Sequence, residues 1–218
     1  MKIDELKNIS RQLSCPTGEQ GIIIGNNMNE ANALITTRSI DNLKPINKES
    51  IIEIGLGNGL LSKRIIELVG EDGNFIGIEK SHVLAQQARK LFCGNGETHI
   101  TIHSSDYNKV NIVPYSIDGI LAVNLLYFID DMDLFFQKLY YWLKPHGRIV
   151  IAIRSSHTLK KIPFTQFYFN LRAENEIINS MSNAGFIDIN SEYYDEGVIK
   201  FNELELPVDA LIIKGLKN

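Results

Sequence analysis

The first 45 residues carry a helical pattern of apolar positions. Apolar side chains recur every three or four positions over residues 2–13, at Ile3, Leu6, Ile9 and Leu13. This spacing predicts a short amphipathic helix. A second helix is expected over about residues 28–43, whereas Pro16, Gly18 and Gly21 predict an irregular segment over residues 15–25. We therefore expect residues 1–45 to form a helical cap.

From residue 46 onward, short apolar runs alternate with amphipathic stretches. Strands are expected over residues 51–54, 75–78, 99–103, 117–123 and 148–153, and helices over residues 60–69, 82–92 and 132–143. Such alternation predicts an α/β fold, doubly wound, in which a mostly parallel sheet carries helices on both faces.

The C-terminal part breaks this alternation. A helix is expected over residues 173–184, ended by Gly185, and two β-rich segments follow at 186–194 and 208–213. Because no helical pattern separates the last two segments, we expect them to pair antiparallel at the end of the sheet, with residues 195–207 as a long loop.

Composition changes this picture little. With 218 residues, 44% of them hydrophobic, we expect a single domain, in which residues 46–218 form the core. A net charge of −4 gives no basic surface for nucleic acid, and no apolar run approaches the roughly 18 residues that cross a membrane. The charged start of the chain lacks the apolar core of a signal peptide, so we expect a cytoplasmic protein. The two cysteines form no CxxC pair.

The main candidate for chemistry is a glycine turn after the first core strand. The apolar strand Ile51–Ile54 runs directly into Gly55, Gly57 and Gly59, and a helical pattern follows. Glycines let the backbone approach a ligand, and the helix behind them offers free N–H groups, so a polar ligand is expected to lie across the turn. Dinucleotide-binding proteins use G-x-G-x-x-G, but Leu60 stands where their third glycine belongs.

Two carboxylates accompany this turn. Glu79 closes the next strand, 20 residues beyond Gly59, where it can accept hydrogen bonds from both hydroxyls of a ribose. Glu53 lies inside the apolar first strand, two residues before Gly55, and a buried carboxylate there needs a partner such as the ammonium end of a ligand. Glu79 thus favours an adenosine-type ligand, NAD included, and the partner of Glu53 is either backbone N–H groups or a ligand cation.

With these residues the sequence closely resembles the class I S-adenosylmethionine-dependent methyltransferases, of the small-molecule type with a methyltransferase domain 11 or 25. The matching motifs are Glu53–Gly59, Glu79, Ser105–Asp106, Asp118–Ile120 with Asn124, and Leu143–Arg148. The resemblance implies a Rossmann-like, seven-stranded sheet with an antiparallel last strand. It also implies S-adenosyl-L-methionine as cofactor, with S-adenosyl-L-homocysteine as its product. We expect the helical cap of residues 1–45 to lie over the cofactor site. The residues it implies for cofactor binding are Glu53, Gly55, Gly57, Gly59, Glu79, Lys80, Ser105, Asp106, Asn124 and Leu125.

The implied reaction is methyl transfer to a small-molecule acceptor by in-line displacement, in which positioning supplies much of the rate and a dedicated base is optional. Candidates for the acceptor site follow strand ends: Tyr107, Asn124, Tyr127, Arg154 and His157. Of these, His157 and Tyr127 are the candidates for a catalytic role. The aromatic-rich residues 162–169 form either the wall of an apolar pocket or part of the core.

No metal site is expected, because His99 and His103 share one face of a strand while Asp106 lies beyond its end. Two alternatives to a methyltransferase remain. One is a nicotinamide-dependent oxidoreductase, which Leu60 and Glu53 disfavour. The other is a non-catalytic module that binds the cofactor, or serves a protein partner through the cap. The sequence carries no signal for an oligomeric state.

Overall fold

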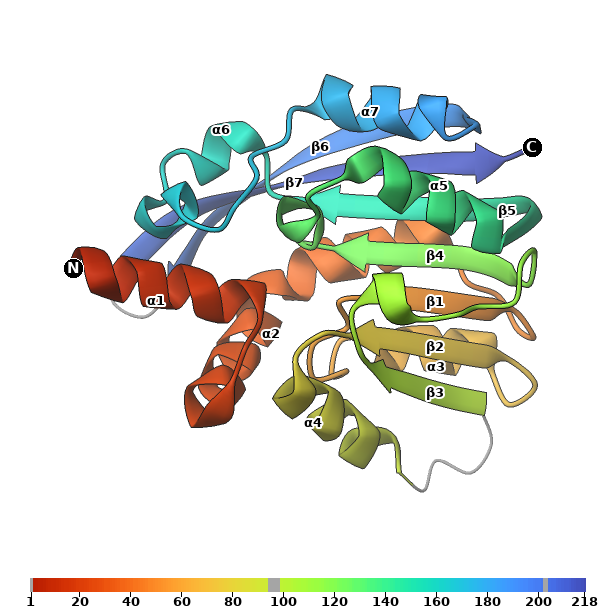
Figure 1. Cartoon of the computed structure of the whole chain (residues 1–218), viewed down its shortest axis with the longest axis horizontal. Coiled ribbons are helices and arrows are strands. Elements are labelled where there is room, and N and C mark those ends of the chain that lie inside the picture. Colours follow the sequence, from red (N-terminus) through yellow and green to blue (C-terminus); the bar gives the residue numbers. More distant parts are fainter. Residues whose placement is uncertain (1, 94–98, 202–203) are drawn as a thin grey trace.

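A computed structural model describes residues 2–93, 99–201 and 204–218 of the chain. Its centre is a seven-stranded sheet in the order β3-β2-β1-β4-β5-β7-β6 (Figure 1). Strands β1 to β5 are parallel to one another, and β7 is antiparallel to both of its neighbours, β5 and β6. The strands are β1 (Ser50–Ile54), β2 (Asn74–Glu79), β3 (His99–Ser104), β4 (Ile117–Val123), β5 (Leu143–Ile153), β6 (Phe186–Phe201) and β7 (Leu204–Lys217). The expected sheet, with its antiparallel last strand, is confirmed.

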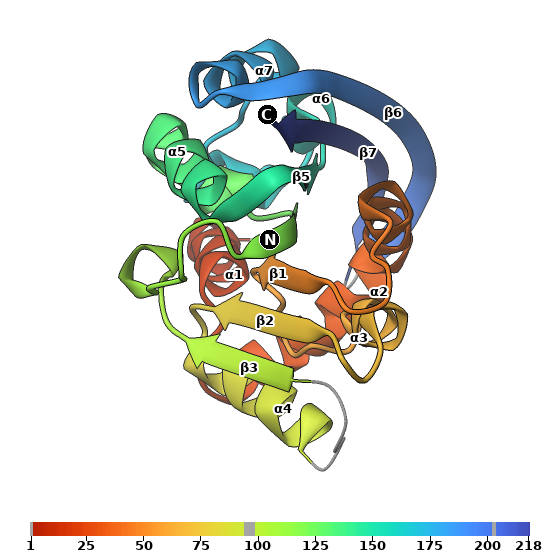
Figure 2. The ribbon, with the colours of Figure 1, turned by 90° about the vertical axis from the view of Figure 1, so that its right-hand side faces the viewer.

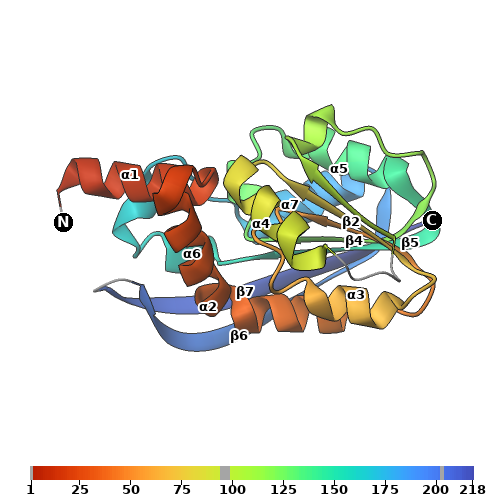
Figure 3. The same cartoon turned by 90° about the horizontal axis from the view of Figure 1, so that it is seen from below.

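Helices pack on both faces of this sheet. They are α1 (Ile3–Ser14), α2 (Gly18–Leu43), α3 (Lys63–Val69), α4 (His82–Phe92), α5 (Met132–Trp142), α6 (Ser156–Leu159) and α7 (Glu174–Asn183), with short 3-10 turns η1 (Tyr107–Lys109), η2 (Leu126–Phe128) and η3 (Pro163–Gln166). Figure 3 shows α5 and α7 on one side of the sheet, and α3 with the C-terminal half of α2 on the other.

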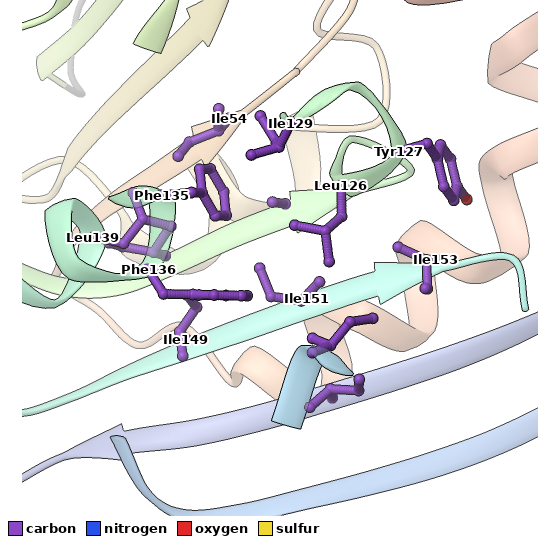
Figure 4. Close-up of a cluster of buried hydrophobic side chains, with 14 of the residues drawn as sticks. Ile54, Leu126, Tyr127, Ile129, Phe135, Phe136, Leu139, Ile149, Ile151 and Ile153 are labelled. Carbon is purple, nitrogen blue, oxygen red and sulfur yellow. The ribbon is translucent and has the colours of Figure 1, made fainter. Parts of the chain in front are cut away.

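The core of the described residues consists of two hydrophobic clusters, one on each face of the sheet. Successive side chains of a strand join different clusters, because they point to opposite faces. Ile120 and Ile149 join the cluster under α5 and α7, part of which Figure 4 shows, whereas Leu121 and Val150 join the cluster under α2, α3 and α4. Strands buried on both faces explain why these segments are almost continuously apolar.

Helix α2 begins earlier than the sequence indicates. Residues 18–25 are helical, so the expectation of an irregular segment there was wrong. The glycines serve close packing instead: a Cβ on Gly21 would lie 2.7 Å from the carbonyl carbon of Pro16, and one on Gly25 would lie 2.5 Å from the side chain of Leu84. The approach of neighbouring elements outweighs the low helix propensity of glycine.

The expected loop over residues 195–207 was also wrong. Strand β6 continues to Phe201 and β7 begins at Leu204, and the two form a long antiparallel pair (Figure 2). The register shifts between Asp195 and Gly197. Residues 202 and 203 of the expected loop lie outside the described residues. The bulge accommodates an extra residue at Gly197, which has a φ of 79°. The polar residues that predicted a loop here therefore belong to a bulged strand.

In the described part of the chain, no helix combines the length and apolarity that crossing a membrane requires.

Candidate functional site

A cleft opens at the carboxyl ends of β1, β2 and β4. It encloses about 750 Å³ of space, part of it open to solvent. In the strand order, β1 lies between β2 and β4, so the chain departs from β1 in opposite directions, and ligands of open α/β sheets bind at this kind of switch point. Figure 1 shows α1 and the start of α2 beyond the strand ends, and Leu13, Ser14 and Pro16 of this cap complete the wall.

The glycine turn lines this cleft at two of its three glycines. Gly55 and Gly57 have φ values of 79° and 61°, and a Cβ on Gly57 would meet nothing within 4 Å. Gly59 does not line the cleft. A Cβ there would lie 2.7 Å from the ring of Phe92, so Gly59 is needed for the packing of α4.

Glu79 lies beside the turn at the end of β2. Its side chain is buried, and its two oxygens accept the N–H groups of Gly57 at 2.9 Å and of Ser81 at 2.7 Å. Burial raises the pKa of Glu79 to about 7, against the effect of these hydrogen bonds. A carboxylate held in this way keeps lone pairs for a ligand hydroxyl in the cleft.

Glu53 faces a recess next to this cleft. The recess is lined by Gly55, Gly57, Asn58 and Thr36, among others. Burial raises the pKa of Glu53 to about 7, and its Oε2 has no hydrogen-bond partner among the described residues. A buried carboxylate oxygen without a partner is costly, so this group is suited to a positively charged ligand group.

The remaining cofactor candidates also line the cleft: Lys80, Ser105, Asp106, Asn124 and Leu125. The Lys80 ammonium lies 3.4 Å from Asp106, and the Ser105 N–H donates to the carbonyl of Glu79 at 2.9 Å. Of the residues expected to bind the cofactor, the structure brings all but Gly59 to the cleft or its recess.

A second, mostly apolar pocket adjoins the cleft and shares Leu13, Met28, Asn124 and Phe128 with it. Phe169 forms its aromatic centre. The ring centroid of Phe169 lies 4.8 Å from that of Phe128 and 5.3 Å from that of Tyr127, and Phe164 stands 6.4 Å away. The segment 162–169 therefore contributes to both pocket wall and core.

The polar groups of this second pocket are engaged within the protein. Asn124 donates to Asn32 of α2 at 2.9 Å and accepts the Tyr127 hydroxyl, which itself accepts the Arg154 N–H at 2.7 Å. The Arg154 guanidinium forms an ion pair with the buried Glu196 and donates to the carbonyls of Ala31 and Asp209. Asn124 has a φ of 52°, a conformation that asparagine tolerates better than most residues.

Neither of the two candidates for a catalytic role, Tyr127 and His157, has the setting of a catalytic base. Burial raises the pKa of Tyr127 far above that of an exposed phenol, so its hydroxyl keeps its proton. His157 is exposed on α6 and does not line the cleft or the second pocket. Tyr107, expected in the acceptor site, lines the cleft with Glu79 and does not line the second pocket.

Several residues that line the second pocket were not predicted from the sequence as site residues. Met28, Asn32, Leu206 and Val208 line the second pocket. The cap was expected to lie over the site, but single positions on a helix give no sign of which one faces a cleft. Leu206 was missed because it was assigned to a loop. No group of three metal-binding side chains occurs within residues 2–93, 99–201 and 204–218.

Comparison with known proteins agrees with this geometry. Residues 51–147 match the family model described as a methyltransferase domain. No curated protein matches the chain.

Several solved structures share the fold. One is *Haemonchus contortus* phosphoethanolamine N-methyltransferase 2 in complex with phosphomonomethylethanolamine and S-adenosylhomocysteine, with a TM-score of 0.67 and 15% identity over 84% of this chain and 52% of that one. The chain thus spans about half the length of that relative.

Two other structures match over most of their length. One is a complex of the *Haloferax volcanii* Trm112 methyltransferase activator with a protein described as a methyltransferase, with a TM-score of 0.72 and 13% identity over 88% of this chain and 92% of that one. The other is an S-adenosylmethionine-dependent methyltransferase from *Aquifex aeolicus*, with a TM-score of 0.64 and 15% identity over 84% of this chain and 89% of that one. The family match thus identifies residues 51–147 as a methyltransferase domain, and the solved structures show that the chain has the fold of S-adenosylmethionine-dependent methyltransferases.

Proposed function

We propose that the protein binds S-adenosyl-L-methionine in the cleft and transfers its methyl group to a small molecule held in the second pocket. The observation that carries this proposal is the arrangement of two pockets that share a wall. One, together with its recess, has a glycine turn and two buried carboxylates, and the other is mostly apolar. The shared wall, at Met28 and Asn124, is where the two ligands would meet.

The residues of the cleft fit the cofactor at both of its ends. Glu79 is placed to accept hydrogen bonds from the ribose hydroxyls, beside the open backbone of Gly57. Glu53 offers its unpartnered Oε2 to the ammonium of the methionyl end. On the side of the cleft formed by β2 and β3 lie Lys80, Ser105 and Asp106, and this position suits the adenine base of the cofactor.

When bound, the cofactor supplies a methyl group already activated by a sulfonium. The protein therefore has to orient the acceptor and exclude water. The rings of Phe128, Phe164 and Phe169 provide an apolar wall. Tyr127 and Asn124 hold each other and so fix the floor between the pockets. Catalysis in this proposal depends on positioning and needs no protein base.

The acceptor of the nematode relative does not suit this pocket. Phosphomonomethylethanolamine carries a phosphate, which needs a free cationic partner. Among the described residues that line the second pocket, Arg154 is the one with a cationic side chain, and its guanidinium is already paired with Glu196. An uncharged acceptor fits better.

Calorimetric titration of the protein with S-adenosylmethionine, S-adenosylhomocysteine and NAD tests the proposal. We expect micromolar binding of the first two and none of NAD, because Leu60 replaces the third glycine of the dinucleotide motif. Binding of NAD alone would favour an oxidoreductase. If none of the three binds, a non-catalytic role becomes the better account.

A further inference from the structure

The second pocket constrains the chemistry of its acceptor in two ways. It is lined mainly by apolar and aromatic side chains, and the titratable or charged residues among its described lining are Tyr127 and Arg154. Behind them stand Glu196, paired with Arg154, and Asp209, which accepts hydrogen bonds from Ser155, Thr158 and Tyr193. The described lining thus presents neither a free charge nor a base.

Because the described lining of the second pocket presents no base, acceptors that need one do not fit it. Tyr127 keeps its proton, Asn124 is engaged with Tyr127 and Asn32, and Arg154 cannot accept a proton. An alcohol has too high a pKa to lose its proton to water before attack. A thiol ionises at roughly pH 8.5 and supplies a reactive thiolate with no help from the protein.

The described lining of the second pocket also presents no free carboxylate, and this favours thiols over amines as acceptors. An amine that accepts a methyl group becomes a cation, and among the described lining residues no free carboxylate would stabilise it. A thiolate that meets a sulfonium leaves two neutral products. An apolar pocket favours a reaction in which charge disappears over one in which charge is kept.

We propose, on the basis of the proposed function, that the acceptor is an uncharged thiol with an apolar, aromatic-sized substituent, and that the reaction is S-methylation. The thiol loses its proton to water. The thiolate lone pair then forms the new S–C bond, and the S–CH₃ bond of the donor breaks with its electron pair staying on the donor sulfur. The products are a neutral methyl thioether and S-adenosylhomocysteine.

Three ligands with the same benzyl group separate the possibilities: phenylmethanethiol, benzyl alcohol and benzylamine. With the protein saturated by S-adenosylhomocysteine, calorimetry should show binding of the thiol and the alcohol, and at least about tenfold weaker binding of the amine, which is a cation at neutral pH. With S-adenosylmethionine, the thiol alone should be methylated. Preferential binding or methylation of benzylamine would overturn the inference.

A pH profile tests the missing base. The rate should rise with the ionisation of the acceptor itself, so benzenethiol, which is more acidic, should reach its plateau at lower pH than phenylmethanethiol. Profiles that coincide for the two thiols would point to a titrating group on the protein and contradict the proposal.

A matched pair of variants tests the pocket. Phe169→Ala should weaken thiol binding about tenfold, because it removes the central ring. Tyr141→Ala, at an exposed aromatic residue of α5, should leave it unchanged. Both variants should bind S-adenosylhomocysteine normally. If the wild-type protein fails to bind S-adenosylhomocysteine, the proposed function is wrong. If it binds S-adenosylhomocysteine but no thiol, the inference alone is wrong.

Discussion

At the scale of single residues, the site holds two buried carboxylates, Glu79 in the cleft and Glu53 in the recess beside it. The pKa values of Glu53 and Glu79 are both raised to about 7, chiefly by burial, from a value of 4.5 for an unperturbed glutamate. Between pH 4.5 and 7 the folded protein therefore binds more protons than the unfolded chain. The contribution of these two groups to folding stability is largest at low pH, where both are neutral, and is lost as the pH rises through 7 and they become charged in the folded protein. Burying two carboxylates therefore costs stability at neutral pH and above, while it leaves oxygen atoms that can accept hydrogen bonds from a ligand.

We predict that Glu53→Gln stabilises the ligand-free protein at pH 8 by roughly 1 to 3 kcal/mol, because it removes a buried charge without a partner. The gain should shrink toward pH 5, where Glu53 is already protonated. Urea unfolding at both pH values measures this, with the exposed Glu67→Gln as a control that should show no such trend. The same variant should bind S-adenosylmethionine more weakly. A variant no more stable than wild type at pH 8 would contradict the burial argument.

Glu79→Gln should weaken binding of S-adenosylhomocysteine by roughly 1 to 3 kcal/mol, since an amide cannot accept from two hydroxyls and two backbone N–H groups as a carboxylate does. In the wild-type protein, affinity should also rise from pH 6 to pH 8, as Glu79 ionises. The variant should show a shallower rise. Calorimetry over this range checks both statements, and parallel profiles for the two proteins would remove Glu79 from the ribose site.

At the scale of elements, the three glycines of the turn divide their tasks. Gly57 lies in open space at the cleft, whereas Gly59 lets Phe92 and Ala88 of α4 pack closely against the turn. The sequence places all three glycines in one motif and gives no sign of this division, because it depends on a contact with Phe92 that is distant along the chain.

The division predicts opposite effects of two alanine substitutions. Gly59→Ala should lower the free energy of unfolding by about 2 to 4 kcal/mol, from strain at positive φ and a Cβ too close to Phe92. Gly57→Ala should cost only about 1 kcal/mol in stability, but should weaken S-adenosylhomocysteine binding more than Gly59→Ala does. Chemical unfolding and calorimetry on both variants measure this. A larger loss of stability in Gly57→Ala would contradict it.

Elements with strong periodic patterns could be predicted from the sequence, and those shaped by long-range packing could not. Strand β4 and helix α4 begin and end where the apolar pattern indicates. Helix α2 and the β6–β7 pair extend beyond their predicted bounds. In α2, Gly21 allows close packing against Pro16, and in β6 a bulge at Gly197 lets the strand continue. The second pocket was incompletely foreseen for the same reason, since Leu206 lies in the misassigned segment.

At the scale of the whole molecule, Arg154 joins parts that are far apart in sequence. Its guanidinium reaches the carbonyl of Ala31 in α2, the carbonyl of Asp209 in β7 and the carboxylate of Glu196 in β6. It thus fixes the cap and the β6–β7 pair to the end of β5, around the second pocket.

Arg154→Met should destabilise the protein by about 3 to 5 kcal/mol, because it leaves Glu196 buried without its main partner. Arg38 stands 3.5 Å from Glu196 and can offset only part of this loss. Adding Glu196→Gln should recover some of the stability, so the two changes should not be additive. Urea unfolding of the single and double variants measures the coupling, and strict additivity would refute the role given to this pair.

The central claim is that one cofactor spans the cleft from Glu79 to Glu53 and presents its reacting group to the second pocket. A crystal structure of the complex with S-adenosylhomocysteine tests it most directly. We predict that the ribose hydroxyls lie on the Glu79 carboxylate, that the amino group lies next to Glu53, and that the sulfur faces the pocket at Asn124 and Met28. A ligand bound elsewhere, or with its sulfur turned away from that pocket, would contradict the account.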